Sequence, residues 1–279
     1  MYTDSDICRL KAKAVQVRAN ILDMIPPGKV GHLGGSMSIA DVVAALYFHH
    51  MRVFDDPKNP QRDRLVFSKG HAVLAQYACL AELGYFSRDE FAHVKTLNGL
   101  LQGHPDIGTP GIEAVTGSLG QGLSVSLGMA LALRLDNNPA RVYCVLGDGE
   151  MAEGQIWEAA MAASAYGADN LCAILDYNGI QATDTTDKVF PIPHVKEKWQ
   201  AFGWATIEID GHDMEAILKA LDQARETKGQ PTMIIAHTVK GKGIDFAENK
   251  AQFHNAAMDA AQYRAAWACV ERMREEIEQ

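Results

Sequence analysis

The most informative pattern of hydrophobic and polar positions lies between residues 142 and 180. Two apolar runs, 142–146 and 171–175, are each short enough for one buried strand, and each ends in polar and glycine residues. About twenty helix-compatible residues separate the two runs, as in a βαβ unit with parallel strands. The polar ends of the two strands, Asp148 and Asn178, should then lie at the same carboxyl edge of a sheet, where open α/β sheets bind ligands.

Helices are predicted on either side of this unit. Apolar residues recur at helical spacing near both ends of the chain. They are Ile7, Leu10, Ala14, Val17 and Ile21 near the start, and Tyr263, Trp267, Val270, Met273 and Ile277 near the end. Ser38 with Asp41, and Ser87 with Glu90, resemble capping boxes. We therefore expect one helix to begin at Ser38 and extend through Met51, and another to begin at Ser87.

Further short strands are predicted at 64–67, 205–209 and 232–238, and a helix is predicted at 213–227. Strands and helices alternate along the chain, and no linker long enough to divide it is present. We therefore expect one α/β domain over residues 1–279, with a mainly parallel sheet and helices on both faces.

Composition narrows the class of protein. The 279 residues are 47% hydrophobic and 22% charged, which is ordinary for a globular protein. The net charge of −9 argues against nucleic acid or an anionic membrane as the main partner. The longest apolar stretch, 123–135, is too short and too interrupted to span a bilayer. Five cysteines without a CxxC spacing, and a start without an apolar signal core, favour a reducing, cytoplasmic compartment.

Asp148 and Asn178 are candidate metal ligands. Carboxylate and amide oxygens suit Mg²⁺ or Ca²⁺, and neither residue offers the sulfur or imidazole that favours zinc. Gly149 lets the backbone approach a phosphate, and a helix beginning near Glu150 would direct amide hydrogens toward it. The alternative is two unrelated turns, and the matched strands with a helix between them favour the metal site.

Four of the ten histidines, His32, His71, His104 and His254, lie in predicted loops, where functional residues are more common than in the core. Imidazole can hydrogen-bond hydroxyl groups and transfer protons near neutral pH. Five of the others have structural settings: His49 and His50 at a helix end, His93 on a helix, His237 in a strand and His212 in a turn.

Gly147-Asp148-Gly149 followed by Asn178 resembles the thiamine diphosphate motif, and the flanking sequence from about Arg18 to His254 resembles transketolases. The resemblance implies a thiamine-diphosphate-binding fold, a thiamine diphosphate cofactor and Mg²⁺, for which Ca²⁺ or Mn²⁺ can substitute. It also implies that the side chains of Asp148 and Asn178 and the backbone carbonyl of Ile180 bind the metal.

The same resemblance assigns the other site residues. The cofactor-binding residues that it implies are His71, Gly117, Ser118, Leu119, Gly149, Glu150 and Asn178. Transketolases usually have proline where this chain has Ser118. His32, His104 and His254 match histidines that contact the sugar or lie near the reacting centre, so we expect them to be catalytic.

Transketolases also have a pyrimidine-binding domain, which supplies the glutamate that activates the cofactor. Because this sequence ends near where that domain would begin, we expect the N-terminal subunit of a split transketolase. Its expected partner is a C-terminal subunit, in an assembly with two copies of each chain. The expected reaction transfers a two-carbon ketol unit from a ketose phosphate to an aldose, so sugar phosphates are the expected substrates.

Two other functions remain open from the sequence. One is a component of a different thiamine enzyme, of the deoxyxylulose-phosphate-synthase or 2-oxo-acid dehydrogenase type. The other is a cofactor-binding regulatory paralogue without activity. The segment 240–243, Lys-Gly-Lys-Gly, lacks the Walker pattern and is interpreted as either a flexible exposed turn or the hinge of a lid.

Overall fold

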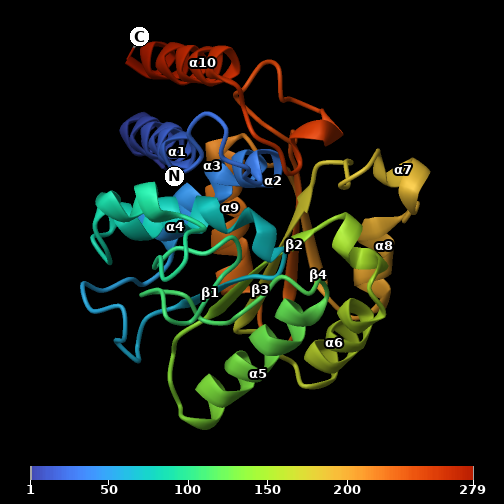
Figure 1. Cartoon of the computed structure of the whole chain (residues 1–279). Coiled ribbons are helices and arrows are strands. Elements are labelled where there is room, and N and C mark those ends of the chain that lie inside the picture. Colours follow the sequence, from blue (N-terminus) through green and yellow to red (C-terminus); the bar gives the residue numbers. More distant parts are fainter. Residues whose placement is uncertain (1, 279) are drawn as a thin grey trace.

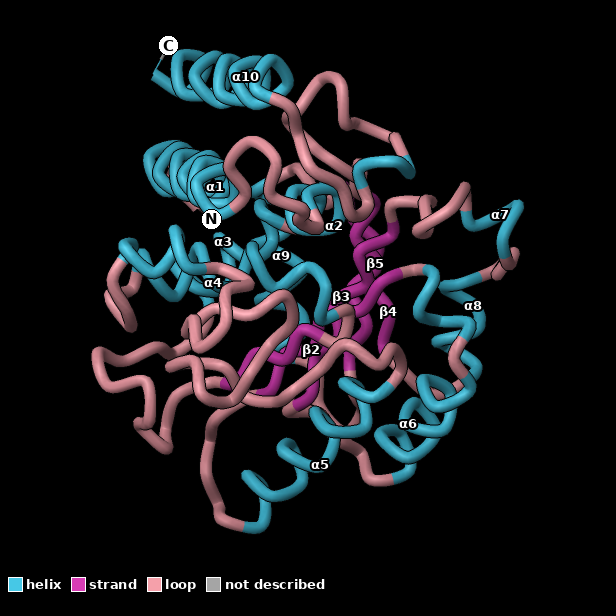
Figure 2. The backbone as a smooth tube through the Cα atoms, viewed as in Figure 1, coloured by secondary structure: helices cyan, strands magenta, loops and turns pink. Residues whose placement is uncertain are grey.

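Five parallel strands form the centre of the molecule in the computed structural model, which describes residues 2–278 (Figures 1 and 2). The strands are β1 Arg64–Phe67, β2 Val142–Gly147, β3 Leu171–Tyr177, β4 Ala205–Asp210 and β5 Thr232–His237. Their order across the sheet is β1-β2-β3-β5-β4, and every neighbouring pair is parallel. The predicted α/β class and the βαβ unit of β2 and β3 are confirmed.

Side chains of the central strands alternate between two hydrophobic clusters, one on each face of the sheet. In β2, Tyr143 and Val145 belong to one cluster, whereas Cys144 and Leu146 belong to the other. None of these four residues is more than 1% exposed. Both faces are therefore covered over the central strands, and this is why β2 and β3 appear in the sequence as continuous apolar runs.

Helices cover both faces of the sheet (Figure 1). The first cluster is formed with α1 Asp4–Met24, α2 Leu33–Ser38, α3 Ala40–Ala45, α4 Val73–Glu82 and α9 Met214–Glu226, and α10 Ala260–Glu278 packs against α1. The second is formed with α5 Gln121–Leu135, α6 Gly154–Ala165 and α8 Val195–Ala201. Shorter helical segments are η1 Leu46–His50, η2 Gly70–Ala72, η3 Arg88–His93, η4 Gly149–Ala152, α7 Thr186–Val189 and η5 Ala251–Phe253.

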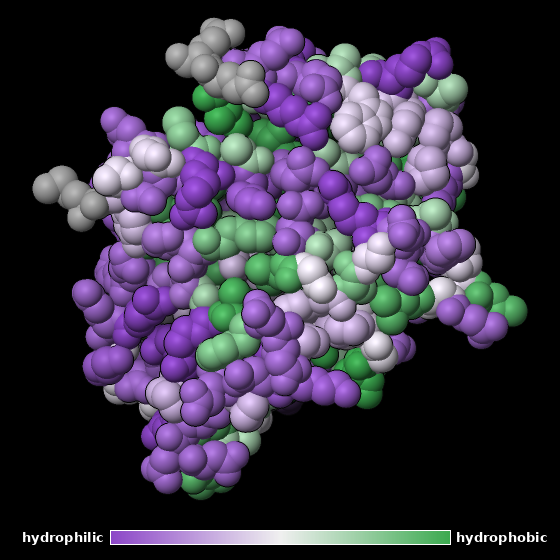
Figure 3. All heavy atoms as spheres, turned by 90° about the vertical axis from the view of Figure 1, so that its left-hand side faces the viewer, coloured by the Kyte–Doolittle hydropathy of each residue, from purple (hydrophilic) through white to green (hydrophobic). Residues whose placement is uncertain are grey.

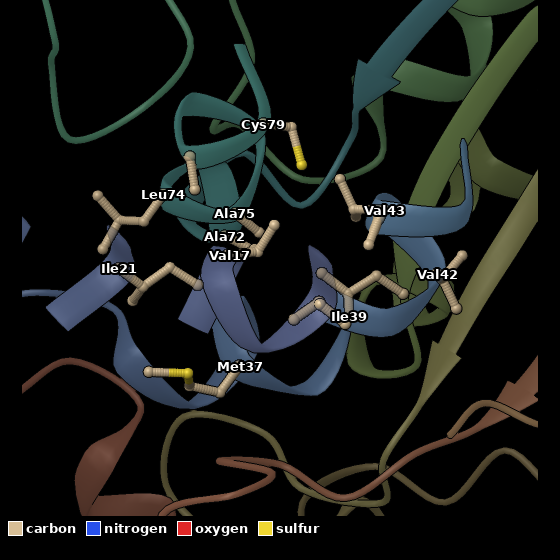
Figure 4. Packing of buried hydrophobic residues seen from close by; sticks show 14 of the residues in the cluster. Val17, Ile21, Met37, Ile39, Val42, Val43, Ala72, Leu74, Ala75 and Cys79 are labelled. Carbon is tan, nitrogen blue, oxygen red and sulfur yellow. The ribbon is translucent and has the colours of Figure 1, made fainter. Parts of the chain in front are cut away.

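The first predicted helix is confirmed as α1, and its apolar side is buried between α3 and α4. Figure 4 shows Val17 and Ile21 of α1 close to Ala75 of α4, with Val43 of α3 beside Cys79 of α4. None of these side chains is measurably exposed. This packing, together with the Thr3 capping box, explains why the helix forms over this stretch.

The chain reverses its direction across the sheet after β4, the edge strand, and this reversal helps to position the functional site. The connection from β2 to β3 uses α6 on one face, whereas the connection from β4 back to β5 uses α9 on the other. Right-handed crossovers require this change of face when the direction reverses. Loops diverge at such a point, so a cavity forms beyond the carboxyl ends of the strands.

The capping box predicted at Ser38 is wrong, and the one predicted at Ser87 is confirmed only for the serine. Ser38 is the last residue of α2, where its hydroxyl donates to Asp176, while Asp41 lies inside α3 and pairs with Arg18. The stretch through Met51 is divided between two helices and the π-helix η1, rather than forming one helix. Ser87 does cap a helix, but that helix is the short 3₁₀ segment η3.

At the opposite, amino-terminal edge of the sheet, His50 ends η1 as predicted, but it does not supply the positive charge there. Burial, followed by the Arg225 charge, lowers the pKa of His50 to about 3, so its ring is neutral. Arg225 instead donates to the His50 carbonyl oxygen. A guanidinium thus interacts with the negative end of this helix.

Hydrophilic side chains predominate on the face that carries α1, α4 and the loops beside them (Figure 3). Apolar residues that are strongly exposed include Leu97, Ile107 and Leu135. Within residues 2–278, no helix has both the length and the apolar content needed to cross a membrane.

Candidate functional site

A cavity of about 310 Å³ lies beyond the carboxyl ends of the strands. Its lining residues are His32, Gly35, Lys69, His71, His104, Gly117, Leu119, Gly147, Asp148, Gly149, Glu150, Asn178, Ile180, Gln181, Ala182, Lys240 and His254. Every residue predicted to be catalytic, to bind the cofactor or to bind the metal is in this set, except Ser118. The structure thus brings together segments that are distant in the sequence.

The predicted metal ligands lie at the ends of two neighbouring strands. Gly147 at the end of β2 pairs with Asp176 of β3, so Asp148 and Asn178 follow at adjacent strand ends. Asp148 is 5% exposed, and its two carboxylate oxygens accept from the backbone N–H groups of Gly149 (2.7 Å) and Gly179 (2.5 Å). Burial, and then the neighbouring Asp176 carboxylate, raise the pKa of Asp148 to about 6.

The fully buried Asp176 organises this region, although no pattern in the sequence indicates its role. It accepts hydrogen bonds from the Lys69 ammonium and the Thr238 hydroxyl. It also accepts from the side-chain nitrogen of Asn178 over 3.1 Å, which identifies the other amide atom of Asn178 as the oxygen. Although burial favours the neutral acid, the Lys69 charge holds the pKa of Asp176 below its usual value. Asp176 therefore orients the amide oxygen that is predicted to bind the metal.

Glu150 lines the cavity, but its carboxylate is engaged by protein groups. It accepts from the Ser68 hydroxyl, from the Gly120 amide (2.8 Å) and from the Gly147 amide (3.1 Å). These contacts hold together the ends of β1 and β2 and the start of α5. The contacts support a role for Glu150 in shaping the site, and its direct binding of the cofactor stays a prediction.

Two of the three residues of the turn 117–119 line the cavity. Gly117 has φ +141°, and a Cβ atom added there would lie 2.9 Å from the His104 ring, so only glycine fits beside this histidine. Leu119 also lines the cavity. Ser118, which lies between them, is exposed and outside the cavity lining. The structure therefore does not support Ser118 as a contact.

The four loop histidines form one cluster. The His32 ring centroid lies 5.3 Å from that of His71, 5.7 Å from that of His104 and 5.5 Å from that of His254, and His71 and His254 are 4.8 Å apart. Burial is the main cause of the lowered pKa values, which are about 3 for His32, about 2 for His71 and about 4 for His254. The pKa of His104 is lowered in the same direction. Neutral imidazoles can both donate to and accept from sugar hydroxyls.

Lys240 lines the cavity, so the interpretation of this residue as part of an exposed turn is wrong. It is 3% exposed, and the interpretation of residues 240–243 as the hinge of a lid stays a prediction. Its ammonium donates to the carbonyl oxygens of Ile180 (2.7 Å) and Gln181 (3.1 Å) and to Nδ1 of His254 (3.0 Å). Burial and the nearby Lys69 charge lower the pKa of Lys240 to about 8, which leaves it mainly charged at pH 7. Because Lys240 donates, Nδ1 of His254 is the acceptor and Nε2 carries the proton in the neutral ring.

The donor set fits a hard cation. Among the described residues no group of three His, Cys, Asp or Glu side chains is placed to hold a metal ion. The candidate ligands are instead one carboxylate, one amide oxygen and one backbone carbonyl, which suit Mg²⁺ or Ca²⁺ rather than zinc. Asp148 is buried and, within residues 2–278, makes no salt bridge with a cationic side chain, so a bound dication would compensate its charge.

Residues 10–270 match the family described as the transketolase, thiamine diphosphate binding domain. The chain belongs to the transketolase family. It is 42% identical over 258 residues to one of the subunits of the apulose-4-phosphate transketolase of Phocaeicola vulgatus, covering 92% of each chain. It is 44% identical to the 6-deoxy-6-sulfo-D-fructose transketolase subunit SqwG of a Clostridium species, covering 94% of this chain and 96% of the relative. The predicted transketolase-type transferase, N-terminal subunit included, is confirmed.

Longer transketolases match over part of their length. Human transketolase is 41% identical over 247 residues, which are 88% of this chain and 39% of the human protein. The transketolase structure from Campylobacter jejuni superimposes with a TM-score of 0.86 at 32% identity, over 96% of this chain and 46% of that one. This fold and the thiamine diphosphate binding of the matched domain are therefore shared with transketolases.

Proposed function

We propose that this chain supplies the diphosphate- and metal-binding half of a split transketolase, which transfers a two-carbon ketol unit between sugars. The observation that carries the proposal is the single cavity in which the oxygen ligands of β2 and β3 lie beside four neutral histidines. An oxygen set alone would fit many phosphate enzymes, and a histidine cluster alone would fit many sugar enzymes. Their combination fits a thiamine enzyme that acts on polyhydroxylated substrates.

The residues that would hold the metal are Asp148, Asn178 and the carbonyl of Ile180, and the metal would supply positive charge for the diphosphate. The ammonium groups of Lys240 and Lys69 line the same cavity, so they supply positive charge beside an anionic ligand. When bound, thiamine diphosphate supplies the carbanion chemistry that breaks and forms the carbon–carbon bond. The protein groups orient it and exclude water from it.

The histidines are proposed to act on the sugar. His32, His104 and His254 would bind its hydroxyl groups and move protons, while His71 would lie against the cofactor. Lys240 keeps the proton of neutral His254 on Nε2, which makes that atom a defined donor. A positioned proton-transfer group typically contributes about 10²–10⁴-fold in rate.

A second polypeptide is proposed to complete the active site. The relatives that match this chain over nearly their whole length are named as subunits, whereas human transketolase is matched over only 39% of its length. The partner would carry the pyrimidine-binding domain and its activating glutamate. We propose two copies of each chain, because each half-site needs its complement.

The donor substrate is proposed to be a ketose that carries an anionic group. One relative is named for a sugar phosphate and the other for a sulfo sugar. Both names describe a sugar with a strongly acidic substituent, so a panel of ketose phosphates and ketose sulfonates should include the donor.

The test is reconstitution with the product of the neighbouring open reading frame. The mixture receives thiamine diphosphate, Mg²⁺, the donor panel and a set of aldoses, and two-carbon transfer is followed by mass spectrometry. We expect transfer that requires both chains and both cofactors. Decarboxylation of pyruvate by the same complex, without ketol transfer, would instead identify another class of thiamine enzyme.

A further inference from the structure

Three largely buried side chains form a network behind the segment that carries Lys240. Arg18 of α1 is 3% exposed, Asp41 of α3 is 9% exposed, and the side chain of His212, in the loop after β4, is 14% exposed. Arg18 donates through Nη1 and Nη2 to the two carboxylate oxygens of Asp41, over 3.0 and 2.6 Å. Nδ1 of His212 lies 2.8 Å from Asp41 Oδ2. Asp41 thus joins the other two.

Both ends of this network reach main-chain atoms of the turn that follows β5. The backbone N–H of Val239 donates to Nε2 of His212 over 2.9 Å. Nε of Arg18 donates to the carbonyl oxygen of Lys242 over 3.2 Å. Lys240 lies between these two anchored residues, and its ammonium reaches the cavity. The turn is therefore held on both sides of Lys240.

The hydrogen bonds define the protonation of His212. A backbone N–H can only donate, so Nε2 of His212 must be the acceptor, and the proton of the neutral ring must be on Nδ1. Burial favours a neutral Asp41, but the Arg18 guanidinium and His212 hold the pKa of Asp41 below its usual value. Asp41 is then the acceptor for Nδ1–H. Carboxylate, imidazole and backbone amide form one continuous chain.

We propose that His212, oriented by Asp41 and Arg18, is a positioning residue that sets the location of Lys240 in the cavity. The proposal depends on the proposed function for the role of the cavity, whereas the placement of Lys240 can be tested without it. Without His212, the Val239 amide loses its acceptor, so the side of the turn that precedes Lys240 loses its anchor while the Arg18 bond to Lys242 remains. A displacement of about 1 Å in a group that positions reactants can reduce the rate by about 10²-fold.

The test measures how exposed Lys240 becomes when His212 is replaced. The free chain is treated briefly with acetic anhydride, and acetylation of Lys240 is measured by peptide mass spectrometry relative to that of Lys69, which is 2% exposed. We expect His212→Phe, which removes both hydrogen bonds, to raise the ratio about tenfold or more if the closed turn opens. His212→Gln retains a donor and an acceptor and should restore part of the protection.

His50→Phe is the matched control, because His50 is also buried but lies at the other edge of the sheet. It should leave the acetylation ratio unchanged even if it lowers the melting temperature. In calorimetric titrations with thiamine diphosphate and Mg²⁺, His212→Phe should bind about 10–100-fold more weakly, as for residues that support a ligand-binding group, and His50→Phe should bind like the wild type.

Unchanged acetylation in a folded His212→Phe variant would overturn the inference. If that variant does not fold, ¹⁵N NMR of the wild-type chain decides: the Nδ1–H tautomer of His212 supports the inference, and the Nε2–H tautomer contradicts it. A wild-type chain that binds no thiamine diphosphate would contradict the proposed function instead, and the acetylation and NMR results would still judge the positioning role.

Discussion

At the scale of single residues, the charge of Asp148 is expected to determine Mg²⁺-dependent cofactor binding. Asp148→Ala removes the charged oxygen ligand, and this should weaken binding by several kcal/mol. Isothermal titration with thiamine diphosphate and Mg²⁺ measures the change. Asp136→Ala, an exposed substitution at the end of α5, is the control. Equal affinities in the wild type and in Asp148→Ala would show that Asp148 is not a ligand.

His32 and His254 are expected to affect turnover more than folding. Replacing either with alanine in the reconstituted enzyme should lower kcat by about 10²–10⁴-fold. The melting temperature of the chain should change by only a few degrees, because both residues lie in loops outside the core. His93→Ala, on the exposed end of η3, should change neither quantity. A large loss of stability with unchanged turnover would mean that these histidines are structural.

The buried histidines should make the fold sensitive to acid. His71 has a pKa of about 2 in the folded chain, whereas an unfolded histidine titrates near about 6.5. The unfolded state therefore binds more protons below pH 6.5. As the pH is lowered below that value, the free energy of unfolding should decrease by up to about 1.4 kcal/mol per pH unit for each such histidine. Asp148, whose folded pKa is raised to about 6, acts in the opposite direction.

Comparing a His71 variant with the wild type isolates the contribution of this histidine to the acid sensitivity. Urea unfolding is measured from pH 8 to pH 4. The free energy of unfolding should depend less steeply on pH for His71→Gln than for the wild type, because glutamine does not titrate. Parallel curves for the two proteins would show that His71 is not the source of the acid sensitivity.

Among the residues of the site, those within strong local patterns could be predicted, and those defined by distant contacts could not. Asp148 and Asn178 follow apolar strands, so their type and position in the sequence indicate a ligand set. Asp176 is the last but one residue of a strand, and its role arises from Lys69 and Ser38, which are more than 100 positions away. No local pattern of the sequence contains that information.

At the scale of secondary-structure elements, the approach of α5 to β1 should tolerate no side chain at Gly122. A Cβ atom there would lie 2.5 Å from the Cα atom of Ser68, so backbone must move. Gly122→Ala should destabilise the chain by about 1–3 kcal/mol. Gly128→Ala, in the same helix, meets nothing within 4 Å and should stabilise it by up to about 1 kcal/mol, because alanine favours helix. Urea unfolding of both variants compares the two sites, and equal effects would contradict the close approach.

The central strands were predictable because both faces of the sheet are buried there, so β2 and β3 are short apolar runs bounded by polar and glycine residues. The helices were less predictable where tertiary contacts override local signals. Ser38 and Asp41 have the spacing of a capping box, yet each side chain bonds to a residue of another element. Serine and aspartate can either cap a helix or bond to another element, and the sequence alone does not distinguish these two roles.

At the scale of the whole molecule, the chain alone should be inactive. The cavity holds the groups proposed to bind the diphosphate and metal, and the activating glutamate is expected from the partner. Purified chain with thiamine diphosphate, Mg²⁺, ketose donors and aldose acceptors should show no transfer above background. Adding the partner should restore it, and size-exclusion chromatography with light scattering should give two copies of each chain. Turnover without a second chain would contradict the split-enzyme proposal.

Because the cavity exists only in the folded chain, cofactor binding can be used to measure how much of the chain has folded. His32 and His254 are 222 positions apart in the sequence (254 minus 32), yet their ring centroids are 5.5 Å apart. Such a contact joins segments from near the two ends of the chain, and contacts of this sequence separation slow folding. Because the unfolded chain has no such cavity, thiamine diphosphate and Mg²⁺ should raise the midpoint of unfolding as their concentrations rise. Recovery of cofactor binding after refolding should consequently lag behind recovery of helix content, which makes the cofactor a probe of the last folding step.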